Sequence, residues 1–206
     1  MKQRLKDVLY PINLVVGNHN HADAVERLGV LANGRVFHIR ENRESEENFA
    51  KRNKTVIGRV PMISTIINNL KVSEAIWGLE DYITYKAKPG DWLVLEKPEL
   101  DLNPLQQKWI VKLLILLSKE KINLFITTHS KKIVEEFSKA IRIGSLSKRE
   151  LTNEEKEYTD SRDLVLNPNN VRVYHLKRNN GLELLTDIKV DRFGIDENTH
   201  AFAEED

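Results

Sequence analysis

Residues 90–130 read GDWLVLEKPELDLNPLQQKWIVKLLILLSKEKINLFITTHS, and this stretch decides the fold of the chain. It opens with the apolar run Trp92–Leu95, which the acidic residue Glu96 closes. Because a strand covered on both faces shows continuous rather than alternating apolar residues, the run predicts a buried strand of a parallel sheet. A second apolar run, Ile122–Ile126, predicts another strand and ends in residues 127–130, Thr-Thr-His-Ser.

The segment between these two strands predicts an α-helix. Asn103 is a good N-cap, and Pro104 suits the first helical position. Apolar residues then recur at helical spacing, namely Leu105, Trp109, Leu113, Leu116 and Leu117. A strand, a helix and a strand, with polar residues at both strand C-termini, predict a βαβ unit of a ligand-binding α/β sheet.

These residues resemble the C-terminal half of an ABC-type ATPase domain. The similar branch is the SMC/RecF-like and OLD-like one, seen in stand-alone bacterial AAA ATPases of DNA repair and phage defence. Its members read apolar strand, D/E-E-P-E, two residues, L-H-P-x-x-Q, helix, apolar strand and T-T-H-S. This chain reads LEKPELDLNPLQQ and then LFITTHS, in the same order and at the same spacing. The resemblance implies a P-loop NTPase-like fold, a mostly parallel sheet flanked by helices.

The resemblance also implies roles for single residues. Glu96 stands at the Walker B position, which holds Mg²⁺ through water, and His129 stands at the switch position, which contacts the γ-phosphate of ATP. Asp101 lies in the segment that replaces the D-loop, and Gln107 matches the glutamine of the helix. Lys97 stands where the family has its general base.

Lys97 is therefore a departure from the family pattern. An ammonium donates hydrogen bonds and cannot accept the proton of an attacking water at neutral pH unless it is strongly desolvated. Its charge would also oppose a Mg²⁺ ion held at Glu96. Hydrolysis of ATP by this chain alone is not expected.

Ser73 occupies the place of the ABC signature motif, just before the helix that leads into the first strand. In the family this serine and a glycine offer a hydroxyl and backbone N–H groups to the γ-phosphate of ATP held by a second subunit. Here the sequence is Ser73-Glu74-Ala75, and Glu74 would repel ATP. The same residues are explained equally well by Ser73 as an N-cap with Glu74 in the first turn.

The phosphate-binding P-loop, G-x-x-x-x-G-K-[ST], is absent. The nearest Lys-Thr pair is Lys54-Thr55, where Asn48 and Asn53 replace both glycines. Those glycines let backbone N–H groups wrap the phosphates, and a side chain there would intrude. The chain therefore resembles an ATPase domain that lacks its N-terminal, nucleotide-holding lobe.

The whole chain divides into two predicted parts. Residues 1–69 form a β-rich segment with a charged loop, and residues 70–206 form an ATPase-like lobe. Elsewhere we expect a strand at 12–16, a hairpin of 30–31 with 35–40, an amphipathic helix at 131–142, a polar surface segment at 145–162, and a C-terminal β-hairpin of 171–176 with 182–190. His19 and His21, with Asp23 nearby, are compatible with a metal site. A polar loop explains them better, because no further ligand follows at a recognisable spacing.

Composition limits the functional class. Apolar residues make up 40% and charged residues 31% of the 206 residues, which suits a globular protein. The net charge of +1 gives no global field toward nucleic acid or membranes. The absence of cysteine excludes disulfides and fits a reducing compartment. No apolar run approaches the ~20 residues of a membrane span, so we expect a cytoplasmic protein without a membrane partner.

Two functions remain open at this level. The chain is either a pseudo-ATPase that serves as a scaffold for a protein partner, such as a complete ATPase subunit, a nuclease, a toxin or a second copy, or half of a split ATPase that binds Mg-ATP with a partner supplying the P-loop. A DNA-linked or defence role follows only by analogy of fold. A degraded remnant without activity is a third interpretation.

Overall fold

The computed structural model describes residues 10–16, 35–39, 79–80, 82–147, 149–153, 155, 162–179 and 182–196. Several sequence-based predictions lie outside these residues: the signature-like Ser73, the charged loop, the Lys54-Thr55 pair, the His19 and His21 pair, the first half of the predicted N-terminal hairpin and the boundary between the two predicted segments. They therefore stay predictions.

The molecule is built on a six-stranded sheet in the order β2-β3-β4-β1-β5-β6. The first five strands in this order run parallel to their neighbours, and β6 is antiparallel to β5. The strands are β1 (Ile12–Val16), β2 (Val36–Ile39), β3 (Trp92–Glu96), β4 (Asn123–Thr128), β5 (Val171–Asn179) and β6 (Leu182–Ile188). This confirms the predicted α/β fold with a mostly parallel sheet and a C-terminal hairpin.

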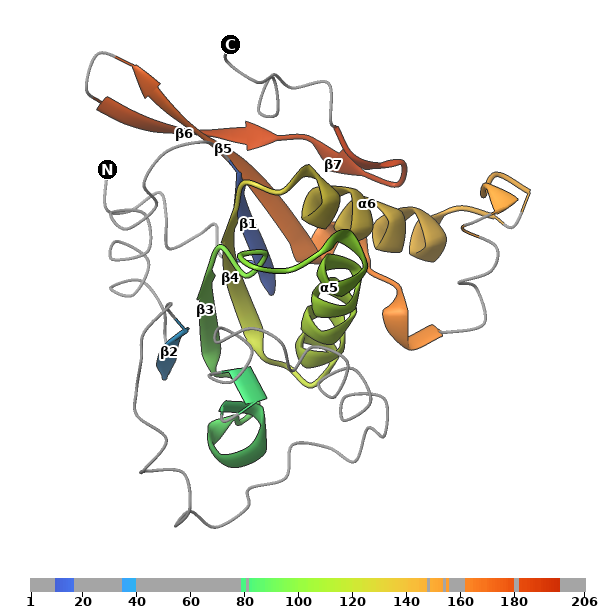
Figure 1. Cartoon of the computed structure of the whole chain (residues 1–206). Helices are drawn as coiled ribbons and strands as arrows, with labels where there is room; N and C mark the ends of the chain where they lie inside the picture. The colour runs from blue at the N-terminus through green and yellow to red at the C-terminus, as the bar shows by residue number, and fades with distance from the viewer. Residues whose placement is uncertain are drawn as a thin grey trace.

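Two helices cover one face of this sheet, α5 (Pro104–Lys119) and α6 (Lys131–Ser145), as Figure 1 shows. Helix α5 connects β3 to β4, and α6 leads from β4 toward β5. The predicted N-cap of α5 is confirmed, because the Asn103 side chain accepts hydrogen bonds from the backbone N–H groups of Leu105 and Gln106, both at 3.0 Å. The predicted βαβ unit is therefore present.

The helices and the sheet bury one large apolar core. Alternate residues of β3 and β4, such as Leu93 and Ile126, join the apolar face of α6 in it. The four residues predicted for that face are all fully buried: Ile133, Val134, Phe137 and Ile141. On the opposite face of the sheet a smaller cluster joins Val15, Val94, Phe125 and Leu176.

Strand β1 lies in the middle of the sheet, between β4 and β5, and all five of its residues are buried. From β1 the chain runs to β2 at one edge, returns through β3 and β4, and continues to β5 on the other side of β1. The strand order therefore reverses at β1. In open parallel sheets, ligands bind outside the carboxyl ends of the strands at such a reversal. The N-terminal segment is thus no appendage to this sheet, because it supplies the central strand.

At the other end of β3, a buried carboxylate joins three parts of the chain. Asp91 accepts two hydrogen bonds from the Arg35 guanidinium, at 3.0 and 2.8 Å, one from the Tyr82 hydroxyl at 3.3 Å and one from the Lys88 backbone N–H at 2.8 Å. Tyr82 belongs to the short π-helical segment η2 (Tyr82–Lys86), and Arg35 precedes β2. Asp91 therefore fastens both segments to the start of β3.

The C-terminal part ends in a two-stranded ribbon that packs on α6. The ribbon consists of β7 (Val190–Asp191) and β8 (Gly194–Ile195) and follows β6, whereas the short helical turns η3 (Arg162–Leu164) and η4 (Pro168–Asn170) precede β5. The Ser138 hydroxyl of α6 accepts a hydrogen bond from the Ile195 N–H at 3.0 Å. Gly194 has a φ of +107°, and a Cβ there would overlap the Ser138 hydroxyl. Only glycine fits this close approach.

Two sequence-based expectations need correction, and one strand pairing was not predicted. Leu105 is 62% exposed, because the buried face of α5 begins only at Ile110. The segment after α6 is not uniformly a surface segment, since Leu151 and Glu155 are buried and Glu155 accepts a hydrogen bond from Arg142 at 2.7 Å. Strand β2 lies within the predicted second half of the N-terminal hairpin, and it also pairs in parallel with β3, which the sequence analysis did not predict.

Among the described residues, no helix combines the length and the apolar character that crossing a membrane requires.

Candidate functional site

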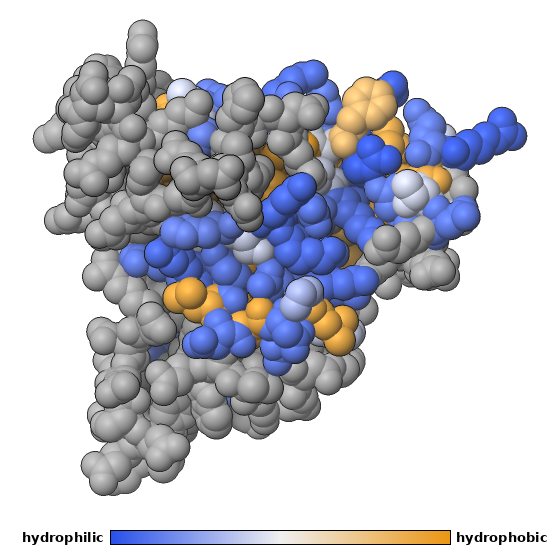
Figure 2. All heavy atoms as spheres, turned by 45° about the horizontal axis from the view of Figure 1, so that its top comes forward, coloured by the Kyte–Doolittle hydropathy of each residue, from blue (hydrophilic) through white to orange (hydrophobic). Residues whose placement is uncertain are grey.

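The polar residues singled out from the sequence meet at the carboxyl ends of β3 and β4. The register places Glu96 level with Thr127 in the neighbouring strand, and Thr127 level with Val15 of β1. The strand ends point upward in Figure 1, and Figure 2, which brings that end forward, shows mostly hydrophilic side chains interrupted by small apolar spots. We call the region formed by residues 96–107 and 127–130 the strand-end site.

Glu96 and Lys97 begin the site where β3 ends. Glu96 is partly exposed, and its place in the alternation of β3 puts it on the face of Val94, opposite α5 and α6. Lys97 has a φ of +47°, and its N–H donates to the Thr127 carbonyl at 2.8 Å. The left-handed backbone is costly for a residue with a Cβ, and such strain is often found at functional sites.

Glu99 links the loop after β3 to the end of β4. Its Oε1 atom accepts a hydrogen bond from the backbone N–H of His129 at 2.7 Å. His129 itself is exposed. The carboxylate therefore holds the position of the histidine without using the imidazole ring. Glu99 is the second glutamate of the LEKPE motif, for which the sequence predicted no role.

Gln107 makes a second connection between the same two segments. Its Nε2 atom donates to the Leu102 carbonyl at 2.9 Å, and its Oε1 atom accepts from the Ser130 hydroxyl at 2.6 Å. The Ser130 hydroxyl also accepts from the Ile133 N–H at 3.2 Å, which caps α6. Gln107 is thus a positioning residue in this structure, since it orients the loop and the start of α6.

Asp101 and the cap of α5 complete the loop. Asp101 is exposed and has a φ of +62°, so two of the three non-glycine residues with positive φ in the described chain lie in this short loop. At the cap, the Gln106 side chain accepts from the Asn103 N–H at 3.0 Å, which completes a capping box. The loop is therefore tightly defined although it is strained.

Two buried polar atoms at this site have no hydrogen-bond partner, the Oε2 of Glu99 and the Oγ1 of Thr127. They are the only such side-chain atoms among the residues that the structure describes. Thr127 is fully buried. Each unsatisfied buried group costs about 1–3 kcal/mol, and one common reason that proteins retain it is a water, an ion or a ligand at that place.

The charge of the loop bears on the type of ligand. Glu96, Glu99 and Asp101 are acidic, and Lys97 is the single lysine or arginine between residues 96 and 107. An unpartnered carboxylate oxygen needs a donor or a cation, because it has only lone pairs to offer. A phosphate group could approach these residues only with its charge compensated.

The residues present fit Mg²⁺ only as a minimal donor set. No three His, Asp or Glu side chains gather as a metal-binding group within the described ranges. Mg²⁺ commonly takes one or two carboxylates from a protein and completes its shell with water and phosphate oxygens. Glu96 supplies one such carboxylate, and Thr127 lies level with it on the next strand.

The position of β1 identifies a sequence segment that pattern reasoning missed. A P-loop follows a strand and precedes a helix, and the residues after Val16 read GNHNHADA. At P-loop spacing, Gly17 takes the place of the first glycine, Ala22 that of the second and Asp23 that of the lysine. These residues lie outside the described part of the chain. The signal for them in the sequence is a glycine that directly follows the first buried strand, not a Lys-Thr pair.

Comparison of the chain with known protein families, with curated proteins and with solved structures finds no match. The resemblance to ABC-type ATPases therefore rests on the sequence motifs alone.

Proposed function

We propose that the chain is a divergent, P-loop NTPase-like relative of ABC-type ATPases that does not hydrolyse ATP alone and serves as a scaffold for a protein partner. The observation that carries the proposal is Lys97 at the general-base position. Its backbone N–H donates to the Thr127 carbonyl at 2.8 Å, so the lysine is fixed beside the end of β4 at the place where the resemblance expects a carboxylate. A protonated lysine cannot accept a proton from water.

Two further replacements support the loss of hydrolysis. Asp23 stands where a P-loop has its phosphate-binding lysine, and Glu74 follows the signature-like Ser73. Both carboxylates would repel a nucleotide phosphate. Three parts of the ATP machinery are thus changed in the same direction. The partner is a complete ATPase subunit, a nuclease, a toxin or a second copy of the chain, and a DNA-repair or phage-defence context follows from the resemblance alone.

A second candidate function is half of a split ATPase. The unpartnered atoms of Glu99 and Thr127 favour it, because a scaffold has no use for unsatisfied polar groups in this loop. In this case Glu96 would hold Mg²⁺, His129 would face the γ-phosphate, and a partner chain would supply the P-loop. Mg²⁺ would compensate the phosphate charge beside the acidic loop.

Titration of Mg-ATP into the purified full chain, by calorimetry and with phosphate release followed in parallel, tests both candidates. The scaffold predicts neither heat at millimolar ATP nor phosphate release. Binding without release that both Glu96→Ala and His129→Ala abolish, but that the remote Lys119→Ala keeps, would support the split ATPase. Phosphate release by the chain alone that Glu96→Ala abolishes would overturn both.

A further inference from the structure

The outer edge of β6 is open in the part of the chain that the structure describes. Strand β6 is the last strand in the order of the sheet, and only β5 pairs with it there. Strand β5 pairs with β1 no further than His175, level with Val16, although it continues to Asn179. The outer half of the β5–β6 hairpin therefore reaches past the carboxyl end of β1, and Figure 1 shows it projecting away from α5 and α6.

The two edge strands of the described sheet differ in the protection that their sequences give. At the opposite edge, β2 is only four residues long, and a very short edge strand limits pairing with other chains. Strand β6 is seven residues long and reads LELLTDI, without proline, glycine, lysine or arginine. Its Leu185 is 41% exposed. A long edge strand rich in apolar residues and without such protection is a template on which another strand can pair.

The two acidic residues of β6 have arginines beside them on β5. Asp187 forms an ion pair with Arg172, with 3.6 Å between the carboxylate oxygen and the guanidinium nitrogen. Glu183 lies opposite Arg178 in the register of the two strands. A strand with the same acidic residues therefore meets less repulsion at this edge than the two carboxylates alone would give.

We propose that the open edge of β6 pairs antiparallel with β6 of a second copy of the chain, about a two-fold axis at Leu184. The inference rests on the proposed scaffold function, for which a second copy is one of the partners named above. A two-fold interface uses the same surface of both copies, so the single unprotected edge supplies both halves of it. The two sheets then form one continuous sheet, and the open backbone N–H and C=O groups of each β6 are paired.

Like charges decide the position of the axis. Residues equally far from the axis on the two copies lie opposite each other. An axis at Leu185 would place Glu183 opposite Asp187 of the second copy, and like charges directly opposite each other are destabilising. An axis at Leu184 places Glu183 opposite Leu185 instead. An axis at Thr186 would extend the pairing beyond β6 into the β7–β8 ribbon.

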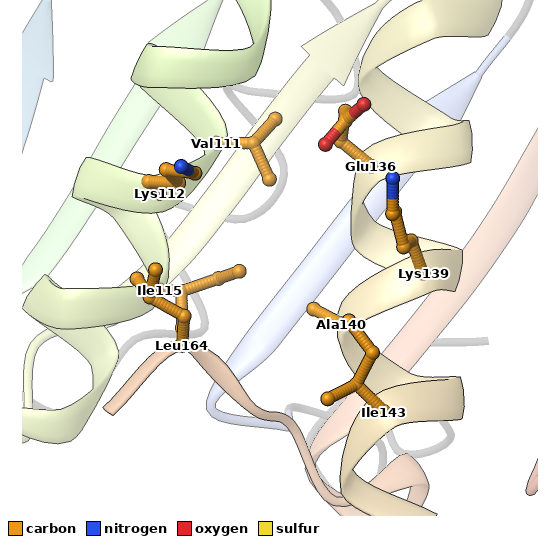
Figure 3. Close-up of a pocket in the computed structure, with 8 residues that line it drawn as sticks. All are labelled: Val111, Lys112, Ile115, Glu136, Lys139, Ala140, Ile143 and Leu164. Atoms are coloured by element: carbon orange, nitrogen blue, oxygen red, sulfur yellow. The ribbon is translucent and has the colours of Figure 1, made fainter. Parts of the chain in front are cut away.

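The hollow between α5 and α6 offers a partner little by comparison. Figure 3 shows the side chains that line it. Its apolar members from the core are exposed by 8% or less, namely Val111, Ile115, Ala140 and Leu164. A polypeptide would therefore find little apolar surface there, whereas the edge of β6 binds through backbone groups and needs no apolar floor.

The oligomeric state of the full chain tests the proposal. Sedimentation equilibrium should show a monomer–dimer equilibrium at micromolar concentrations. Leu184→Lys places two ammonium groups opposite each other at the axis and should weaken the dimer about tenfold or more. Leu184→Glu should weaken it likewise, and mixing the two variants should restore a dimer because the opposed charges then attract. The matched control Leu105→Lys, at a 62% exposed leucine of α5, should dimerise as the unchanged chain does.

The absence of cysteine from the chain makes the register measurable. Under oxidation, Leu184→Cys should form a disulfide-linked dimer, because Cβ atoms of directly opposite residues lie about 4.5–5.5 Å apart, close to the separation that a disulfide requires. Leu185→Cys should not, because its two copies are diagonal neighbours about 7–8 Å apart. Linkage of Leu185→Cys but not of Leu184→Cys would overturn the proposed axis. If urea unfolding shows that the charged variants do not fold, these two cysteine variants decide alone.

A full chain that stays monomeric, or a dimer that Leu184→Lys leaves unchanged, would overturn the proposal. If the monomeric chain dimerises only after removal of residues 197–206, its own C-terminal segment is the occupant of the edge. A monomeric chain would leave the scaffold function to a different partner. Phosphate release by the chain would remove the scaffold function instead, whatever the oligomeric state.

Discussion

The two ends of strand β3 hold their acidic residues in opposite ways. At the start of the strand, the Asp91 carboxylate accepts four hydrogen bonds, from Arg35, Tyr82 and Lys88. Beyond the end of the strand, Glu99 uses one oxygen on the His129 N–H and leaves the other buried without a partner. Asp91 directly precedes β3 and Glu99 lies three residues after it, so the two carboxylates flank the same strand.

The difference separates a structural carboxylate from a candidate ligand-binding one. A buried group whose hydrogen bonds are all made within the protein stabilises the fold and needs no ligand to complete them. A buried group that keeps an unsatisfied atom reduces stability, and this cost is expected where a ligand completes the site. Hydrogen-bond accounting thus places the candidate site at the carboxyl end of the sheet, without reference to any family.

The largest effect on the free energy of unfolding is expected at the start of β3, where the carboxylate has all its hydrogen bonds. Asp91→Ala leaves the Tyr82 hydroxyl and the Lys88 N–H without an acceptor and removes the partner of Arg35. We expect the free energy of unfolding to fall by about 3 kcal/mol. This is the lower end of the range for a broken buried ion pair, because Arg35 is 47% exposed. Urea unfolding measures it, with Asp187→Ala, an exposed ion-pair residue, as the control. A loss no larger than that of the control would show that Asp91 does not fasten these segments.

The next effect lies in the connection between the two loops of the strand-end site. Ser130→Ala removes the N-cap of α6 and the hydrogen-bond donor to Gln107. We therefore expect the free energy of unfolding to fall by about 1–2 kcal/mol. The control is Ser118→Ala in the last turn of α5, where the hydroxyl bonds only to the Ile115 carbonyl of its own helix. Equal losses in the two variants would argue that Gln107 does not couple the loops.

The satisfied end also predicts a pH dependence. Burial and the charge of Asp91 raise the pKa of Tyr82. The folded state therefore holds the phenolic proton more tightly than the unfolded chain, whose tyrosine pKa is about 10. This stabilisation is complete below that pH and is lost as the pH rises above it.

Urea midpoints at increasing pH test this prediction, and Tyr82→Phe should flatten the alkaline decline. Tyr174 provides a comparison on the opposite face of the sheet, since burial raises its pKa to about 12, so Tyr174→Phe should remove a separate part of the decline. An alkaline decline that persists unchanged in Tyr82→Phe would contradict the prediction.

The smallest effect on the free energy of unfolding is expected at the strand-end site, where two buried atoms have no hydrogen-bond partner. Thr127→Val keeps the shape of the side chain and removes a hydroxyl that has no partner, so we expect a change within about 1 kcal/mol, toward greater stability. Thr128→Val is the matched comparison, because the neighbouring hydroxyl accepts from the Ser130 N–H at 3.0 Å and its removal should destabilise. A clear loss in Thr127→Val would mean that its hydroxyl has a structural partner after all.

Much of this architecture was predictable from local sequence. The strands β1, β3 and β4, the Asn103 cap and the apolar face of α6 were all expected, because capping and apolar periodicity are properties of a few neighbouring residues. The exposure of Leu105 was not, since helical spacing alone does not say where the buried face of a helix begins. Nor was the burial of Glu155, which depends on Arg142 thirteen positions away.

The sequence by itself determined the βαβ unit and the C-terminal hairpin. Only the tertiary structure decided that β1 is the central strand, that Glu99 holds His129, and that Gln107 joins the loop to α6. The physical reason is distance along the chain. The hydrogen bond of Glu99 spans 30 residues and that of Gln107 spans 23, and no local pattern specifies which strand ends will meet.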